Sequence, residues 1–339
     1  MTNQTNTTVT TANLTEFGRA LAVHKSYKTS ITIWTAFELT VIFAGALLNA
    51  VTLAVTVTHP PLRRASSCAL LCHCISIDLF MTLCTQPGSV LISYIGPDAT
   101  TPWHFCQIWG GVAFGAYYLN IWAHCLLAVN RFIAFVFPHH YKYAVTKPVL
   151  IGSARVPWLM AGILEIFPVA GINMTYEPGT SWPSGCHSAE LSVKTSRVLN
   201  IMGIYLPCVI IGVCYSVIIV KAKIAATRRN HVVQPAEVEV LHHGGLVLMK
   251  RYQMSKILFL CFLWFCVANF PQPIAGGYLP VRISGDPLFG LSMKGLQSVS
   301  CAINPIFFLL ISKDYIQGRI SLLMQLRAHF QQRLRWQYR

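Results

Sequence analysis

Charge is scarce in this chain of 339 residues, because only 11% of them are Asp, Glu, Lys or Arg, and just 11 residues are acidic. A soluble globular domain averages about 25% charged residues. Apolar residues make up 54% of the chain, and its mean hydropathy is +0.52. The composition therefore excludes an ordinary soluble domain and predicts an integral membrane protein.

Other features are also missing from the sequence. The first 30 residues carry no apolar core, so we expect no cleavable signal peptide and expect the first membrane span to direct insertion. No internal repeat, low-complexity tract or second domain is found, whereas transporters of this size usually show repeats or broken helices in matching halves. Asp78 is the only aspartate deep in an apolar stretch, which excludes an intramembrane hydrolase that needs two facing aspartates. We therefore expect no enzyme.

Seven apolar stretches are long enough to cross a bilayer. Lipid offers no partner for an open backbone, so each stretch is predicted to be a helix. The fold class expected is all-α, a seven-transmembrane helix bundle followed by a short amphipathic eighth helix. Three parts are expected: an outer tail over 1–30, the bundle over 31–311, and the eighth helix with a basic tail over 312–339. The predicted spans cover residues 31–57, 67–94, 104–136, 149–171, 197–221, 254–279 and 287–311.

The third stretch is the predicted helix relative to which the positions of the others in the membrane can be assigned. Cys106 and Arg131 stand near its two ends, and no charged residue lies between them from Gln107 to Val129. At roughly 1.5 Å per residue, one helix over this distance crosses the bilayer and its margins. We expect the cysteine at one face of the membrane and the arginine at the other.

Basic residues set the orientation. Lys and Arg gather in the loops after spans one, three and five and in the C-terminal tail, which predicts that this side is cytoplasmic and the N-terminus extracellular. The excess accounts for the net charge of +15 through anionic lipid or a docking protein, without nucleic acid. A multi-pass protein of the plasma membrane is expected. Its outer tail carries three Asn-x-Thr glycosylation acceptors, at Asn3, Asn6 and Asn13.

The motifs, spread over all seven stretches, resemble those of the rhodopsin-like (class A) G-protein-coupled receptors. Asn49 resembles the asparagine of the first helix in that family, and Asp78 the aspartate of the second. Asn130-Arg131-Phe132 resembles the Asp/Glu-Arg-Tyr triplet, and Asn304-Pro305-Ile306-Phe307-Phe308 resembles Asn-Pro-x-x-Tyr. Further matches are Trp103, Pro138, Trp158, Pro168, Pro207, Tyr215, Phe265, Pro271 and Tyr315. The resemblance reaches melatonin-like, Moody-like and chemosensory receptors without settling a subfamily.

Three departures from the family pattern carry expectations. Asn130 replaces the acid of the triplet and Arg251 stands where an acid often begins the sixth helix, so Arg131 loses both usual resting partners and some ligand-independent signalling is expected. Phe308 replaces a tyrosine that usually joins a water network with Tyr215. Asn269 stands where the family has a tryptophan at the floor of the pocket.

The resemblance implies a disulfide between Cys106 and Cys186, the two cysteines of the twelve at outer positions. Closing a loop of about 80 residues is worth roughly 4 kcal/mol in a chain-entropy model. If the helix faces align as in that family, the resemblance implies a carboxylate among amide and hydroxyl groups in mid-membrane, which suits a small hard cation. The resemblance implies sodium as a negative modulator, and a water-filled hydrogen-bond cluster without an ion is the alternative. The set comprises Asp78, Asn120, Ser300 and Asn304, with Asn49 beside them.

The ligand pocket that the resemblance implies opens outward between helices three, five, six and seven. Its lining comprises Ala113, Phe114, Tyr117, Asn269, Gln272, Lys294 and Ser298. Alanine at position 113 speaks against a monoamine, because amine receptors carry an aspartate there. Lys294 favours a ligand with a carboxylate, sulfate or phosphate, unless it reaches to the outer surface or pairs with Glu165. Retinal is not expected, because its lysine position is held by Ser298.

The function predicted is transmission without chemistry and without a required cofactor. An extracellular ligand, an anionic small molecule or a peptide, shifts the bundle equilibrium. The sixth helix swings outward at Pro271, and a heterotrimeric G protein docks on the activation residues Asn130, Arg131, Phe132, Tyr215, Asn304, Pro305 and Phe308. Residues 225–249, with Gly244-Gly245, are expected to be a flexible tether. The alternative is a membrane transporter or proton carrier that uses Asp78 and Glu165 as a relay.

Overall fold

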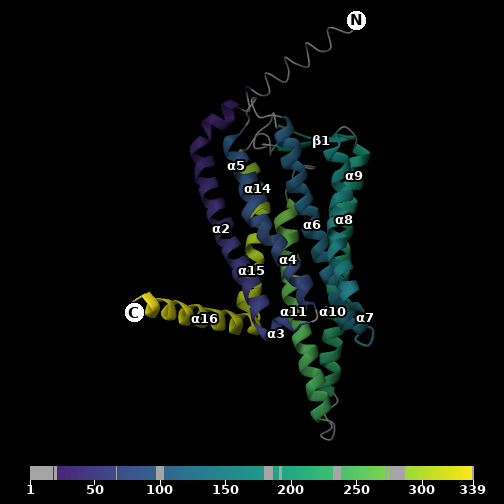
Figure 1. Cartoon of the computed structure of the whole chain (residues 1–339). Helices are drawn as coiled ribbons and strands as arrows, with labels where there is room; N and C mark the ends of the chain where they lie inside the picture. Colours follow the sequence, from purple (N-terminus) through teal and green to yellow (C-terminus); the bar gives the residue numbers. More distant parts are fainter. Residues whose placement is uncertain are drawn as a thin grey trace.

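Long helices run side by side and account for nearly all of the molecule in a computed structural model (Figure 1). The structure describes residues 21–65, 67–96, 103–178, 186–190, 193–231, 238–271 and 287–337, together with Gly18 and Ile274. Asn3, Asn6, Asn13 and Gln272 lie outside the described residues. The tether expected at 225–249 is wrong over most of its length, because α10 continues to His231 and Gly244-Gly245 lie within α11.

Six helical spans are long and apolar enough to cross a membrane, and a bent pair makes a seventh among the described residues. The first span is α2 (Lys28–Thr58). The second is built from α4 (Cys68–Phe80), a π-helical turn η1 (Met81–Thr85) and α5 (Gln86–Ile95). The third and fourth are α6 (Trp103–Val136) and α8 (Lys147–Val169). The fifth runs from α9 (Val193–Asn200) through the π-helical turn η2 (Ile201–Tyr205) into α10 (Leu206–His231), and the sixth is α11 (Val238–Asn269).

The seventh span is broken. α14 (Pro287–Ser298) and α15 (Ser300–Ile311) meet at an angle of 46° around Val299, where the sequence had predicted one continuous helix. Trp264 of α11 donates to the carbonyl of Ser300 at this break, at 3.0 Å. The bend therefore lies where the sixth and seventh spans are hydrogen-bonded to each other.

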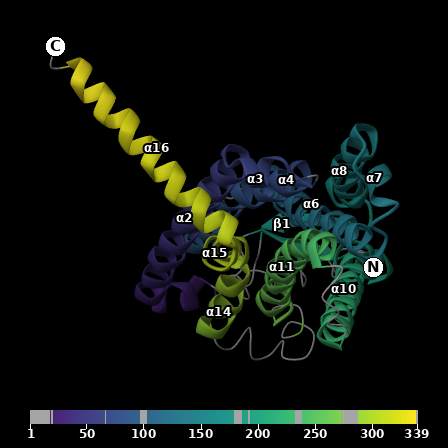
Figure 2. The same cartoon turned by 90° about the horizontal axis from the view of Figure 1, so that it is seen from below.

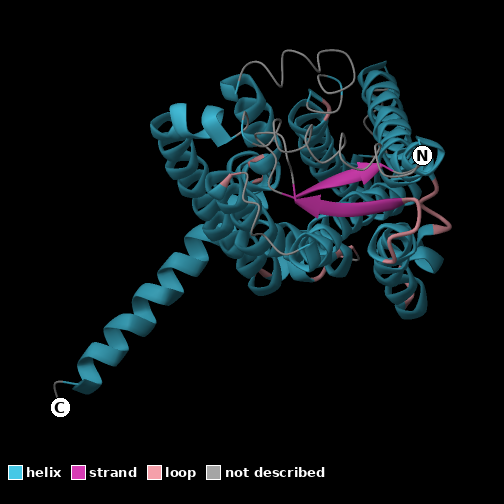
Figure 3. Cartoon of the chain, turned by 90° about the horizontal axis from the view of Figure 1, so that it is seen from above, coloured by secondary structure: helices cyan, strands magenta, loops and turns pink. Residues whose placement is uncertain are grey.

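α6 forms the centre of the bundle, packing against α4, α8, α10 and α11. Its inward side chains join one continuous apolar core. The core reaches from Leu199, at the end predicted to be extracellular and called the outer end, to Tyr315 at the opposite, inner end. On the outer side, two antiparallel strands, β1 (Met174–Pro178) and β2 (Cys186–Glu190), pair with Met174 opposite Glu190 and Pro178 opposite Cys186. Seen from above, this hairpin lies across the end of the bundle (Figure 3).

The inner end carries three further helices. Two are short, α3 (Pro60–Arg63) and α7 (Tyr141–Ala144), and lie in the connections after α2 and α6. The last, α16 (Lys313–Gln337), leaves the bundle sideways as a single straight helix (Figure 2). Its 25 residues extend over about 37 Å. The eighth helix is thus much longer than the short one expected.

Candidate functional site

A buried carboxylate at the middle of the bundle is held by two amides. Asp78 of α4 is 3% exposed. Its Oδ1 accepts a hydrogen bond from Nδ2 of Asn120 on α6 at 2.6 Å, and its Oδ2 accepts one from Nδ2 of Asn304 on α15 at 3.1 Å. Three helices are therefore joined through one side chain, in the region where the sequence placed these residues.

Histidine 124 is a neighbour that the sequence reasoning missed. It lies one helical turn from Asn120 on α6, and its Nε2 is 3.8 Å from Oδ1 of Asp78. The signal that could have found it is an imidazole four residues after a polar amide in an otherwise apolar span, since such residues share a helix face. His124 also lines a small interior cavity with Tyr215, Cys261, Phe262, Phe265 and Asn304.

The remaining members of the mid-membrane set lie around this core. Asn49 of α2 donates from Nδ2 to the carbonyl of Cys301 at 3.1 Å, and Gly45, one turn away, lets α2 pack closely on Ala302. Ser300 precedes Cys301 at the start of α15 and is buried. Asn49 and Ser300 therefore adjoin the cluster of Asp78 without hydrogen bonding to its carboxylate among the described residues.

The donor set suits the sodium ion that the resemblance implies. Oδ1 of Asn304 is buried and has no hydrogen-bond partner in the described part of the chain, and it belongs to the amide whose nitrogen already contacts Asp78. A carboxylate, an unpartnered amide oxygen and a hydroxyl are the hard oxygen ligands that such a cation prefers. Asp78, Asn304 and Ser300 would hold the ion, with Asn120 fixing the carboxylate.

At the inner end of α6, Arg131 is 8% exposed and Asn130 is buried beside it. The amide oxygen of Asn130 accepts from the hydroxyl of Tyr141 on α7 at 3.5 Å. Asn130 stands where the family usually has an acid, so this position supplies no carboxylate. Its amide instead links α6 to α7 through Tyr141. The ring of Phe132, the third residue of the triplet, packs edge-on against Phe137 at 5.9 Å.

Phe308 and Tyr215, two of the expected activation residues, are both buried but lie in different contacts. The ring of Phe308 on α15, next to the Asn304-Pro305 pair, packs on Tyr315 at 5.4 Å between centroids. The hydroxyl of Tyr315 is 2.7 Å from Oγ1 of Thr56 on α2. Burial raises the pKa of Tyr315, so its hydroxyl stays protonated. Phe308 therefore joins α15 to α16, whereas Tyr215 faces the interior cavity.

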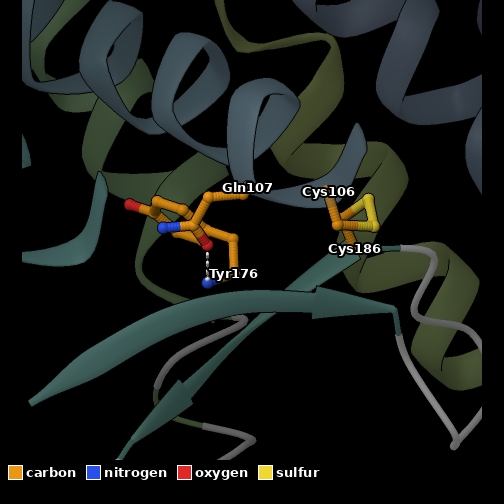
Figure 4. Close-up of a disulfide and its surroundings, with 4 residues drawn as sticks. All are labelled: Cys106, Gln107, Tyr176 and Cys186. Atoms are coloured by element: carbon orange, nitrogen blue, oxygen red, sulfur yellow. Dashed lines mark hydrogen bonds between the residues drawn. A yellow bond between two sulfur atoms is a disulfide. The ribbon is translucent and has the colours of Figure 1, made fainter. Parts of the chain in front are cut away.

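The outer hairpin is fixed to α6 by a disulfide and by hydrogen bonds beside it (Figure 4). Cys106 and Cys186 are bonded, across 80 residues of sequence. The next residue, Gln107, accepts from the backbone N–H of Tyr176 at 3.0 Å and donates to the carbonyls of Pro168 and Val169 at 2.6 and 2.9 Å. One amide thus ties the start of α6, the end of α8 and strand β1 together.

Tyr176 points from β1 into the bundle and is fully buried. Its hydroxyl donates to the carboxylate of Glu165 on α8, with oxygen distances of 3.1 and 3.0 Å. Burial, together with the charge of Glu165, raises the pKa of Tyr176, which keeps it a donor. Gly110 provides the room, because a Cβ there would overlap the tyrosine ring. Glu165 is therefore committed to the hairpin, and the pairing of Lys294 with Glu165 considered from the sequence is wrong.

The expected ligand-pocket residues fall into separate contacts. Phe114 stacks on Tyr176 at 5.2 Å, and Tyr117 stacks on Phe265 at 6.2 Å, with Ala113 one position before Phe114 on α6. Nδ2 of Asn269 donates to the carbonyl of Phe265 and Oγ of Ser298 to the carbonyl of Lys294, whereas Oδ1 of Asn269 is buried without a hydrogen-bond partner among the described residues. Among the described residues, the ammonium of Lys294 on α14 makes no hydrogen bond and has no carboxylate within 4.0 Å.

A second buried carboxylate, Glu38 of α2, was not singled out from the sequence. It is 5% exposed, and its Oε2 has no hydrogen-bond partner among the described residues. A Cβ on Gly295 of α14 would overlap its Oε1. The missed signal is an acid inside an apolar span, which is by default a candidate functional residue. Glu38 thus faces the residue that follows Lys294.

Seven apolar helical spans, a disulfide-tethered outer hairpin and a buried carboxylate joined to three spans define a seven-transmembrane receptor. Residues 48–308 match the model of the 7 transmembrane receptor (rhodopsin family), and the chain belongs to this family. It is 21% identical over 300 residues to rhodopsin from Sminthopsis crassicaudata, covering 85% of this chain and 80% of that protein. It is 27% identical over 229 residues to the growth hormone secretagogue receptor type 1 of Homo sapiens, covering 63% of this chain and 61% of that protein. Rhodopsin from Lethenteron camtschaticum is 24% identical over 300 residues, covering 85% and 79%.

The family confirms the predicted fold class and makes this chain a multi-pass membrane receptor rather than an enzyme. A G protein and an extracellular ligand are the partners that membership implies.

Proposed function

We propose that this receptor binds an extracellular ligand through an acidic group and activates a heterotrimeric G protein when α11 moves outward. The single observation that carries the ligand class is Lys294, whose ammonium has no carboxylate within 4.0 Å among the described residues. A cation on a partly buried helix face favours an anionic guest such as a carboxylate, sulfate or phosphate. Small acids and peptides with a free carboxyl terminus both satisfy this requirement.

The proposed transmission runs from the outer pocket through Asp78 to Arg131. A ligand shifts the equilibrium only by its difference in affinity for the two states of the bundle. Side chains of α11 line the small interior cavity together with Tyr215 and His124, and we expect them to repack there between those states. Pro207, where η2 passes into α10, removes a helical backbone donor, which makes the fifth span able to bend. Pro271, where the sequence predicted the bend of the sixth helix, instead lies beyond the end of α11 at Asn269. Arg131 and Tyr215 would then receive the G protein.

Sodium is proposed as a negative modulator at Asp78. A bound cation would neutralise the carboxylate and join α4 to α15 through Asp78 and Asn304, which favours the resting bundle. We further propose that the N-terminus is extracellular, that Asn3, Asn6 and Asn13 carry glycans, and that the receptor works at the plasma membrane.

The experiment that tests this function is a ligand screen with G-protein dissociation as the readout, run beside Lys294→Ala. Acidic compounds should activate the wild-type receptor and lose at least tenfold in potency in the variant, equivalent to about 1.4 kcal/mol. Gln297→Ala, on the same helix, is the matched control and should leave potency unchanged. Acidic agonists that act equally on Lys294→Ala would overturn the anionic site.

The competing proposal is a transporter or proton carrier with Asp78 and Glu165 as its relay. Two contacts favour the receptor. Asp78 is bonded to Asn120, whereas Glu165 is bonded to Tyr176 of the outer hairpin and approaches Gly111 and Gly115 on α6. Asp78 and Glu165 therefore lie beside positions of α6, Asn120 and Gly111, that are nine residues or about 13 Å apart along the helix. Solute or proton flux in liposomes that depends on both carboxylates would favour the carrier instead.

A further inference from the structure

Three polar atoms on the outer half of α2 are buried without a hydrogen-bond partner in the described part of the chain. They are Nε1 of Trp34, Oγ1 of Thr35 and Oε2 of Glu38. Thr35 and Glu38 are 7% and 5% exposed. An unpaired polar atom away from water costs on the order of 1–3 kcal/mol, and an unpaired carboxylate more. A partner from outside the described residues, such as a bound ligand, would satisfy these atoms.

This group faces α14 next to Lys294. A Cβ on Gly295 would overlap Oε1 of Glu38 and would lie 3.0 Å from Nε1 of Trp34, so both side chains rest on the glycine. Further out, Ile31 and Leu291 form a small apolar cluster with Trp34 and Tyr94. The carboxylate of α2 and the ammonium-bearing residue of α14 thus occupy neighbouring helices in the outer half of the bundle. No ion pair within 4.0 Å joins them.

The opposite side of the outer bundle is already filled. Tyr176 of the hairpin stacks on Phe114 and donates to Glu165, and Gln107 holds its backbone. Glu165 therefore has a donor from within the chain, and Tyr176 takes up the space that a ligand would need between α6 and α8. Glu38 and Lys294 carry opposite charges in this half, and neither has such a partner among the described residues.

We propose that Glu38 and Lys294 form one two-charge binding site between α2 and α14, which takes a zwitterionic ligand. The ammonium of the ligand binds the carboxylate of Glu38 and its acidic group binds Lys294. Thr35 offers a hydroxyl beside the ammonium. This inference rests on the acidic-ligand function proposed above and adds a required basic group to that ligand.

The first experiment asks, without a ligand, whether the two charges share one water-accessible space. In Lys294→Cys, the added thiol is modified by a cationic and by an anionic methanethiosulfonate, with the wild-type receptor as background. The carboxylate of Glu38 should favour the cationic reagent by about tenfold, and Glu38→Gln should abolish that preference. Glu165→Gln is the matched control and should preserve it. An equal preference with and without Glu38 would overturn the site.

The second experiment tests the ligand class. ω-Amino acids of increasing chain length are compared with their N-acetyl and methyl-ester derivatives, using the melting temperature of the purified full-length receptor as the readout. At least one amino acid should stabilise the wild-type receptor, both blocked forms should fail, and Glu38→Gln and Lys294→Met should each abolish the effect. Stabilisation by no probe of any length overturns the zwitterionic ligand.

Two outcomes separate this inference from the function on which it rests. If N-acetyl derivatives stabilise as well as the amino acids, and only Lys294→Met removes the effect, the acidic-ligand function stands and the role of Glu38 is wrong. If neither form acts and the thiol preference ignores Glu38, both proposals fail. Energetic coupling between Glu38→Gln and Lys294→Met without any probe would show a pair inside the chain and would also overturn the site.

Discussion

Two of the buried carboxylates, Asp78 and Glu38, differ in what surrounds them. Asp78 receives N–H groups from Asn120 and Asn304, so its negative charge is balanced by hydrogen bonds from two other helices. Glu38 has no hydrogen-bond donor among the described residues and rests on a glycine. A charge with hydrogen-bond partners on other helices holds those helices together, whereas a charge without a partner is available to bind a ligand. The first is therefore suited to transmission and the second to recognition.

Replacing each carboxylate by leucine should give the largest difference. Asp78→Leu leaves the amides of Asn120 and Asn304 buried without an acceptor, which should lower the free energy of unfolding by roughly 3 kcal/mol. Glu38→Leu removes an unpaired charge and should leave stability unchanged or raise it. Thermal unfolding of the purified receptor measures both. Equal losses in the two variants would erase the distinction between the sites.

Glu165 offers a third carboxylate that sharpens the comparison, because its donor comes from the outer hairpin. Tyr176→Phe keeps the ring but deprives Glu165 of its hydroxyl, and should reduce stability by about 2 kcal/mol. Tyr143→Phe, at an exposed tyrosine, is the control and should change stability by less than about 0.5 kcal/mol. If the two variants have the same melting temperature, the hydrogen bond from Tyr176 to Glu165 does not contribute to stability.

A smaller effect is expected at the inner end, where the contact partners are neutral. Tyr315→Phe loses the hydrogen bond to Thr56 that joins α16 to α2, and should reduce stability by about 1 kcal/mol. Thr56→Val removes the other half of the same bond. The double variant should be less destabilised than the sum of the two singles, and strict additivity would show that the bond contributes nothing.

The smallest effect is a dependence on pH at the N-terminal end of α2. Nε2 of His24 lies 3.1 Å from the carbonyl of Tyr94, and burial lowers the pKa of His24 while the charge of Lys28 acts in the same direction. The folded receptor therefore binds fewer protons than the unfolded chain. This part of the stability should be present above the ordinary histidine pKa of about 6.5 and be lost as the pH falls below it. Melting curves of His24→Ala should lack this step, and an unchanged pH profile would rule out His24 as its source.

How much of the fold and of the site could be predicted from the sequence depended on the kind of signal. Apolar length predicted the seven spans, because lipid requires a continuous run of about 20 residues in each helix. The cluster of Asp78, Asn120 and Asn304 followed from the family resemblance, which implied how the helix faces align. The break at Val299 did not, because no Gly or Pro marks it and it arises where Trp264 binds the carbonyl of Ser300. A bond between side chain and backbone on distant segments leaves no local pattern.

Three functional candidates were missed for related reasons. His124 and Glu38 are single polar residues within apolar spans, and only their neighbours on other helices distinguish them from isolated substitutions. Tyr176 lies in a loop whose path into the bundle depends on Gly110 and on the disulfide at Cys186. Each becomes visible only when contacts between segments far apart in the sequence are known.

The central claim is that Asp78 and Arg131 belong to one bundle that passes a signal from the outer pocket to a cytosolic G protein. The most direct measurement is nucleotide exchange on G protein in membranes that contain the wild-type receptor, Arg131→Ala or Asp78→Asn, with insertion checked by surface labelling. The account predicts measurable basal exchange in the wild type and its loss in both variants. Unchanged exchange in correctly inserted variants would contradict it.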